Sequence, residues 1–423
     1  MRTSALCTAV LTYMVIGHPP PAGAQVDQQR AQEYFKEAQA LCERDGGRLW
    51  GVSICAPMVI ADRRTQTIAT SQPAPDGPRP RLLGLLNAPV QWGGVTWIAY
   101  MWDDVMNRPA RRRKELFLHE LFHGVQAQLG VAAAALDSEH LDAADGRYWL
   151  RLEWRALARA LRESGEPRAL AVRDALAFRQ ARRLLYPGSA ESERGQEITE
   201  GVASYTATVL ATDSAADALV SALDLLTDAE AAALESSFVR TFAYTSGPAY
   251  GLLLDAASPG WTRRVRGADD LAMLLMRALA VEPAVDATGS AGRYEGGAVR
   301  ASEQQREQQR LQRLAELRRQ FVEGPVLLLP GGGGAQFNSM GAVSIPGAGT
   351  VYFGPYNASG PWGTLAAEKG VLIASDGGSR RVSAPVRRDD GTFVGDGWTF
   401  KAGAGWMVRE GARRGDYEVV RQP

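Results

Sequence analysis

The chain has 423 residues, enough for two or three domains with a sizeable core. Hydrophobic residues make up 45% and charged residues 22%, as in an ordinary globular protein. Because 47 basic residues balance 47 acidic ones, composition gives no support to a protein that binds nucleic acid or an anionic membrane surface, and we expect no nucleic-acid partner.

The first 24 residues have the pattern of an export signal. Arg2 precedes an apolar run over residues 5–16, three prolines, and the triplet Ala22-Gly23-Ala24, which fits an A-x-A cleavage site. We therefore predict a signal peptide over 1–24, cleaved near Ala24, and a secreted or periplasmic protein; an uncleaved N-terminal anchor is the alternative. No later stretch reaches the roughly 18 consecutive apolar residues of a membrane helix, so no membrane span is expected after signal removal.

Two cysteines remain beyond the signal, Cys42 and Cys55. An exported protein meets oxidising conditions, which favours a Cys42–Cys55 disulfide, with two free thiols as the alternative. By loop-entropy arguments such a bond would contribute about 3 kcal/mol to stability. Both cysteines are far in sequence from the histidines and do not have the pattern of zinc ligands.

The spacing of apolar residues predicts one helix and a small sheet within residues 25–100. Apolar residues recur every three to four positions over 25–43, which predicts a helix ended by Gly46 and Gly47. Short alternating runs then predict a β-sheet within 49–100, interrupted by a Pro-rich loop at 73–80. The expected strands are 49–54, 58–62, 67–71, 90–92 and 95–100.

Helical spacing dominates residues 109–323, and strand-like runs follow from 324. The expected helices are 111–129, 148–161, 168–185, 197–210, 215–226, 229–239, 248–257, 269–280 and 302–321, with a Gly/Ala-rich linker at 284–297. Seven short runs between 342 and 420 predict an all-β sandwich or barrel. The fold class is therefore α+β, with one domain over 25–323 and a C-terminal β-domain over 324–423.

The segment His119-Glu120-Leu121-Phe122-His123 reads H-E-x-x-H within a predicted helix. On a helix His119 and His123 lie one turn apart on the same face, where two imidazoles can hold a zinc ion. Glu120 lies beside them, where a carboxylate can take a proton from a water molecule. Histidines of the surface or core are the alternative interpretation, but two of only four histidines in the chain lie in this pattern.

A third ligand must come from elsewhere in the chain. In metzincins a Gly follows the second histidine by three residues and a third His ligand follows it by six. These two positions are Gln126 and Leu129 here, so the metzincin layout is excluded. The remaining candidates are Glu153, Glu197, Glu200 and His140.

Residues 197–205, Glu-Ile-Thr-Glu-Gly-Val-Ala-Ser-Tyr, resemble the segment that carries the third ligand in gluzincin metallopeptidases. The resemblance implies a zincin-like core in which His119, His123 and Glu200 hold Zn2+ and Glu120 is the catalytic base. A group of uncharacterised secreted bacterial proteins also has a similar pattern. It combines an H-E-x-x-H motif extended by three residues to a Gln, here Gln126, with a segment like that of residues 197–205. Ser204 stands where thermolysin-like enzymes have an Asp that orients a histidine.

Further residues complete the expected site. Glu197 lies three residues before Glu200 and is a candidate partner for a histidine N–H. Gln126 lies on the motif face and is expected to line the cleft, with a solvated surface residue as the alternative. Tyr244 and Tyr250 surround a Gly-Pro pair and are candidates to donate a hydrogen bond to an oxyanion, Tyr244 being favoured; a core tyrosine is the alternative for each.

Together these features predict an exported zinc-dependent peptidase that hydrolyses a peptide or protein substrate. The alternative is a catalytically inactive secreted binding or scaffold protein on a metallopeptidase fold. No motif indicates the cleavage specificity, an endo- or exopeptidase mode, the role of the β-domain or the oligomeric state.

Overall fold

The computed structural model describes residues 25–134, 136–337, 342–375 and 378–423. The expected signal peptide, 1–24, lies outside the described residues. The α+β class is confirmed, and the chain divides into two compact units, 1–303 and 304–423. The division falls inside helix α12 (Gly296–Arg318), whereas the sequence places the boundary after this helix. In the described part of the chain, no helix combines the length and the hydropathy needed to cross a bilayer.

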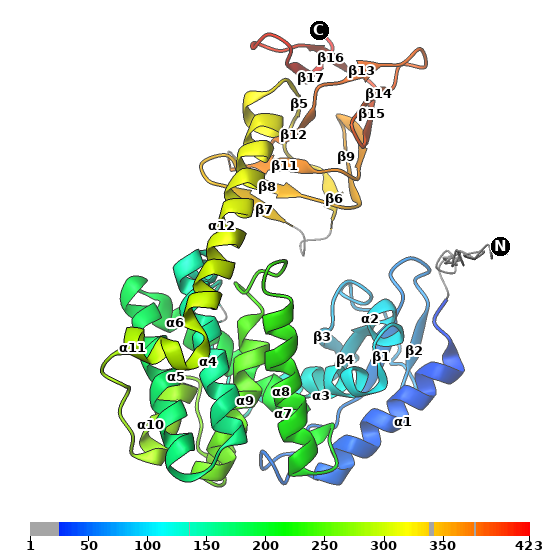
Figure 1. Ribbon diagram of the computed structural model, residues 1–423. Coiled ribbons are helices and arrows are strands. Elements are labelled where there is room, and N and C mark those ends of the chain that lie inside the picture. Colours follow the sequence, from blue (N-terminus) through cyan, green and yellow to red (C-terminus); the bar gives the residue numbers. More distant parts are fainter. Residues whose placement is uncertain (1–24, 135, 338–341, 376–377) are drawn as a thin grey trace, which may run out of the picture. The chain divides into compact units, whose positions relative to one another are not determined.

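The first unit begins with helix α1 (Gln28–Asp45) and a four-stranded sheet in the order β2-β1-β4-β3 (Figure 1). Strands β1 and β4 are parallel and the other pairs are antiparallel. Alternate residues face opposite sides, as in any pleated sheet: Ile60 and Tyr100 join the main helical core, while Val59 and Ala99 join a smaller cluster. The strands are β1 (Met58–Ala61), β2 (Ile68–Thr70), β3 (Ala88–Trp92) and β4 (Val95–Met101).

The strand expected at 49–54 is not formed. Asp45 is the physical reason, because its carboxylate accepts hydrogen bonds from the backbone N–H groups of Gly47 and Leu49 and holds the chain in turns. The sulfur atoms of Cys42 and Cys55 are within bonding distance, so this turn region is enclosed by the expected disulfide.

Helices form the rest of the first unit. The expected helix at 229–239 is absent, because α8 continues to Ala231 and turns follow. Helix α9 begins at Phe242 and not at Pro248, and the linker expected at 284–297 contains α11, η4 and the start of α12. The helices are α2 (Trp102–Met106), α3 (Ala110–Gln126), η1 (Glu139–Asp142), α4 (Ala144–Arg162), α5 (Gly165–Leu185), α6 (Ser189–Gln196), η2 (Glu197–Gly201), α7 (Val202–Leu210), α8 (Ala215–Ala231), α9 (Phe242–Ala257), η3 (Trp261–Arg263), α10 (Leu271–Leu279), α11 (Ala287–Ala291) and η4 (Gly292–Tyr294).

Helix α3 lies between the sheet and the later helices, where it contacts β3 and β4 on one side and α7 on the other (Figure 1). Gly124 permits the contact with the sheet, because a Cβ atom there would lie 2.9 Å from Cδ1 of Ile98. Phe117, Leu118, Leu121 and Phe122 are all buried. Burial of these apolar residues fixes which face of α3 remains for polar chemistry.

The second unit contains two sheets that share one hydrophobic cluster. Their strand orders are β13-β14-β15-β10-β9-β6 and β16-β17-β5-β12-β11-β8-β7, and the cluster includes Leu365 and Phe400 from the first sheet and Leu327 and Val382 from the second. After η5 (Arg319–Glu323) the strands are β5 (Val326–Leu329), β6 (Gly334–Gln336), β7 (Val343–Ile345), β8 (Gly349–Tyr352), β9 (Tyr356–Gly360), β10 (Gly363–Ala367), β11 (Val371–Ala374), β12 (Arg380–Ser383), β13 (Val386–Arg387), β14 (Phe393–Gly395), β15 (Trp398–Ala402), β16 (Trp406–Glu410) and β17 (Tyr417–Arg421).

Candidate metal centre

Three side chains from two helical segments converge in the first unit. His119 and His123 lie one turn apart on α3, and Glu200 comes from η2, a single π-helical turn between α6 and α7. The Nε2 atoms of the two histidines are 3.0 Å apart. Oε2 of Glu200 lies 3.2 Å from Nε2 of His119 and 3.5 Å from Nε2 of His123. Within the described residues this is the only such group of potential metal ligands.

The spacing of these donor atoms fits one small cation. In a tetrahedral site with bonds of about 2.0–2.1 Å, two ligand atoms lie about 3.3 Å apart. The three separations between the Nε2 and Oε2 atoms, 3.0, 3.2 and 3.5 Å, lie on both sides of this value. Burial raises the pKa of Glu200, but hydrogen bonds with His119 and His123 outweigh this effect and hold the pKa well below its usual range. The carboxylate is therefore ionised and available as a ligand.

Gln126 orients His123. The side-chain nitrogen of Gln126 faces the carbonyl oxygens of Ile198 and Thr199, each at 2.9 Å, and carbonyls only accept hydrogen bonds. This fixes the amide, so that Oε1 of Gln126 accepts a hydrogen bond of 2.7 Å from Nδ1 of His123. With its proton on Nδ1, neutral His123 presents the Nε2 lone pair to the site. Gln126 is 4% exposed, so the alternative of a solvated residue is wrong.

Ser204 contacts Nδ1 of His119, as Gln126 contacts Nδ1 of His123. Its Oγ atom lies 3.3 Å from Nδ1 of His119 and is buried, four residues after Glu200 on the continuing helix α7. A hydroxyl can accept a hydrogen bond from Nδ1 and leave Nε2 of His119 free to bind a cation. Ser204 thus contacts His119 through a short, uncharged group.

Replacing Gln126 by Met is expected to weaken the affinity of this candidate site for a divalent cation about 10- to 100-fold, because the side chain keeps its length but loses the bond to His123. Competition with a chromophoric chelator measures the affinity. Gln128→Met is the matched control, since Gln128 is exposed two residues further along the chain. Equal affinities in the two variants would show that the contact with His123 does not contribute to metal binding.

Glu120 lies between the histidines in sequence and is 8% exposed. Burial raises the pKa of Glu120, while the nearby His119 and His123 oppose the rise and Glu200 adds to it. A carboxylate with a raised pKa is a better proton acceptor than an ordinary surface glutamate. Its position next to the cluster and its electrostatic environment suit a general base.

Tyr244 lies against the cluster from the first turn of α9. Its ring stacks on that of His119, with centroids 5.2 Å apart and 17° between the planes. Burial, followed by the neighbouring carboxylate of Glu200, raises the pKa of Tyr244 above its ordinary value. The hydroxyl therefore stays protonated and can donate a hydrogen bond. Because 39% of the residue is exposed, an arriving molecule can reach it.

Two glycines bring α9 close to the turn that carries Glu200. A Cβ atom on Gly247 would lie 2.1 Å from the carbonyl oxygen of Gly201, so no larger residue fits at position 247. The next residue, Pro248, lies inside the helix and has no N–H for the carbonyl of Tyr244, four residues earlier. The close approach of Gly247 to Gly201 places the first turn of α9, with Tyr244, beside the cluster of His119, His123 and Glu200.

Tyr250 is not part of the site. It is fully buried on α9, and its hydroxyl donates a hydrogen bond of 2.8 Å to Oε1 of Glu153. Six residues along a helix turn a side chain well away from the direction of Tyr244. Tyr250 is therefore a core tyrosine, and its proposed catalytic role was wrong.

Glu197 does not hold a histidine N–H. It is buried and bound to Arg179, whose Nη1 donates a hydrogen bond of 2.7 Å to Oε2 of Glu197. In an α-helix Glu197 and Glu200 would share a face, but the wider π turn rotates the two positions apart. The other candidate ligands also have different partners: Glu153 binds Arg179 and Arg182, and His140 contacts Glu193 at 2.8 Å.

Comparisons with protein-family models, with curated proteins and with solved structures found no match for this chain. Interpretation of the site thus depends on its own geometry. Sequence reasoning missed the contact of Ser204 with His119, although Ser204 follows Glu200 by one helical turn, a spacing that could have indicated it.

Proposed function

We propose that the protein is an exported zinc-dependent peptidase of gluzincin type. The observation that carries the proposal is the convergence of His119 Nε2, His123 Nε2 and Glu200 Oε2 at separations of 3.0–3.5 Å, with a buried Glu120 next to them in sequence. Two imidazoles, one carboxylate and an open fourth position form the ligand set of catalytic zinc sites. The predicted signal peptide and the Cys42–Cys55 pair support export.

His119, His123 and Glu200 would hold the ion, and Zn2+ bound there would supply Lewis acidity that makes a water molecule more acidic and polarises a peptide carbonyl. Glu120 would take a proton from the water as its oxygen bonds to the carbonyl carbon, which gives a tetrahedral adduct with a negatively charged oxygen. It would then deliver this proton to the amine nitrogen, and the C–N bond would break as the carbonyl re-forms. Tyr244 would donate a hydrogen bond to the oxygen that gains negative charge. Gln126 and Ser204 would keep both imidazoles in the orientation that binds metal.

Metal analysis of the wild type beside Glu200→Ala tests this proposal. We expect one zinc ion per wild-type chain, and a loss of affinity of more than about 100-fold in Glu200→Ala, because a direct ligand contributes more than its hydrogen-bonded neighbours. Glu191→Ala is the matched control, since Glu191 is an exposed glutamate on the preceding helix α6. Absence of zinc from the wild type after exposure to the ion would contradict the metal site. Stoichiometric zinc without cleavage of a broad peptide library would favour a binding or scaffold protein.

A further inference from the structure

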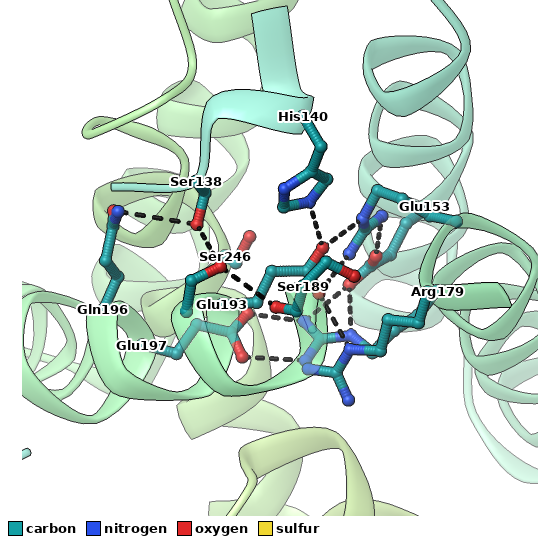
Figure 2. A network of polar contacts seen from close by, with 12 residues as sticks. Ser138, His140, Glu153, Arg179, Ser189, Glu193, Gln196, Glu197 and Ser246 are labelled. Carbon is teal, nitrogen blue, oxygen red and sulfur yellow. Dashed lines mark hydrogen bonds and ion pairs between the residues drawn. The ribbon is translucent and has the colours of Figure 1, made fainter. Parts of the chain in front are cut away.

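A cluster of buried charges includes Glu197, the first residue of the turn that carries Glu200 (Figure 2). Arg179 and Arg182 on α5 bind three carboxylates from other helices: Glu153 on α4, Glu193 on α6 and Glu197 on η2. The exposed fraction of these five side chains is at most 3%. Such a cluster needs complete pairing, because an unpaired charge in the interior is strongly unfavourable.

Arg179 connects the turn Glu197–Gly201 to the rest of the helical core through hydrogen bonds. It donates to both carboxylate oxygens of Glu197 and also donates from Nε to Oε1 of Glu153, at 3.0 Å. Tyr250 donates to the same Glu153 oxygen. Two parallel bonds between a guanidinium and a carboxylate fix direction as well as distance, which a single bond does not.

The turn needs such support because it is π-helical. Its closing bond runs from the N–H of Val202 to the carbonyl of Glu197, five residues earlier, and the wider turn interrupts the regular α-helical pattern. On the α3 side, Gln126 donates to the carbonyls of Ile198 and Thr199. On the α5 side, Arg179 holds Glu197, the first residue of the same turn.

We propose that Arg179 and Glu197 are positioning residues for the metal ligand Glu200. Their ion pair fixes the rotation of the π turn, so that Glu200, three residues later, points at His119 and His123 and not into the core. This inference rests on the proposed metal site. A buried ion pair adds little net stability compared with well-packed apolar residues, whereas its fixed geometry specifies one arrangement of the turn.

The experiment compares two isosteric variants of the full chain, Glu197→Gln and Glu193→Gln. Glu193 belongs to the same cluster, is equally buried and lies on the same helical run, but it binds Arg182 and precedes the π turn. Both variants are expected to lower the melting temperature. Only Glu197→Gln is expected to weaken Zn2+ affinity, by about 10- to 100-fold, and to alter the visible spectrum of bound Co2+, which reports ligand geometry. Arg179→Lys, which keeps the charge but not the paired bonds, should have the same effect on metal binding.

The outcomes separate the two proposals. Equal losses of Zn2+ affinity in Glu197→Gln and Glu193→Gln would mean that the cluster only stabilises the core, and would overturn the positioning role while leaving the metal site intact. If Glu197→Gln does not fold, Arg179→Lys decides, and a folded Arg179→Lys with wild-type affinity and Co2+ spectrum overturns the inference. A wild type that binds no Zn2+ overturns both the inference and the proposed function.

Discussion

Glu120→Gln is expected to lower kcat for peptide hydrolysis by about 10²- to 10⁴-fold, the usual contribution of a general base. The carboxamide has nearly the shape of the carboxylate but cannot accept the proton of the attacking water. His119, His123 and Glu200 are unchanged, so Zn2+ should remain bound at the wild-type stoichiometry. Steady-state kinetics and metal analysis of the same preparation measure the two properties separately.

Glu115→Gln is the matched control for this variant. Glu115 is on the same helix α3, one turn before His119, but its carboxylate is engaged by Arg112 and by the hydroxyl of Ser221. We expect its activity to match that of the wild type. Unchanged hydrolysis in Glu120→Gln would refute the assignment of Glu120 as the base.

Arg182→Met is expected to lower the free energy of unfolding by about 3–5 kcal/mol. Arg182 has no exposed surface, and it donates to Glu153 at 2.7 Å and to Glu193 at 2.6 Å. Met fills much of the space but removes the cation, so two buried carboxylates lose a partner. Urea unfolding followed by tryptophan fluorescence measures the loss.

Arg64→Met provides the contrast for this prediction. Arg64 faces Asp103 at 3.4 Å, and both side chains are 58% exposed. A surface pair of this kind contributes about 0–1 kcal/mol, so unfolding should change little. Similar losses in the two variants would argue against a special role of the buried cluster.

The β-strands of the second unit show where periodicity is informative. Two of the seven runs expected between 342 and 420, at 371–373 and 398–401, correspond to the observed strands Val371–Ala374 and Trp398–Ala402. The strands Val326–Leu329 and Phe393–Gly395 were not predicted although they contain apolar residues. The strands Gly334–Gln336, Tyr356–Gly360 and Gly363–Ala367 were not predicted either. They are rich in Gly, Ala and Ser, which have low intrinsic strand preference, and pairing with neighbours determines them.

The segment around Pro248 shows a limit of local rules. Pro is common in the first turn of a helix, which suggested a helix start there. The helix begins at Phe242 instead, because residues before the proline pack against the ligand turn through Gly247 and Gly201. Tertiary contact here outweighs the local preference.

The local part of the site could be predicted from the order of residues alone. The spacing of His119, Glu120 and His123 on one helix follows from helical geometry, and Glu200 was the favoured third ligand by resemblance. The packing of the folded chain was needed to identify the distant acid that contacts the histidines and the residues that orient them. Glu153, Glu197 and Glu200 are chemically alike, and the choice among them depends on how α4, α5 and the π turn pack. Packing of elements far apart in the chain, unlike the period of a helix, is not encoded in any short stretch of sequence.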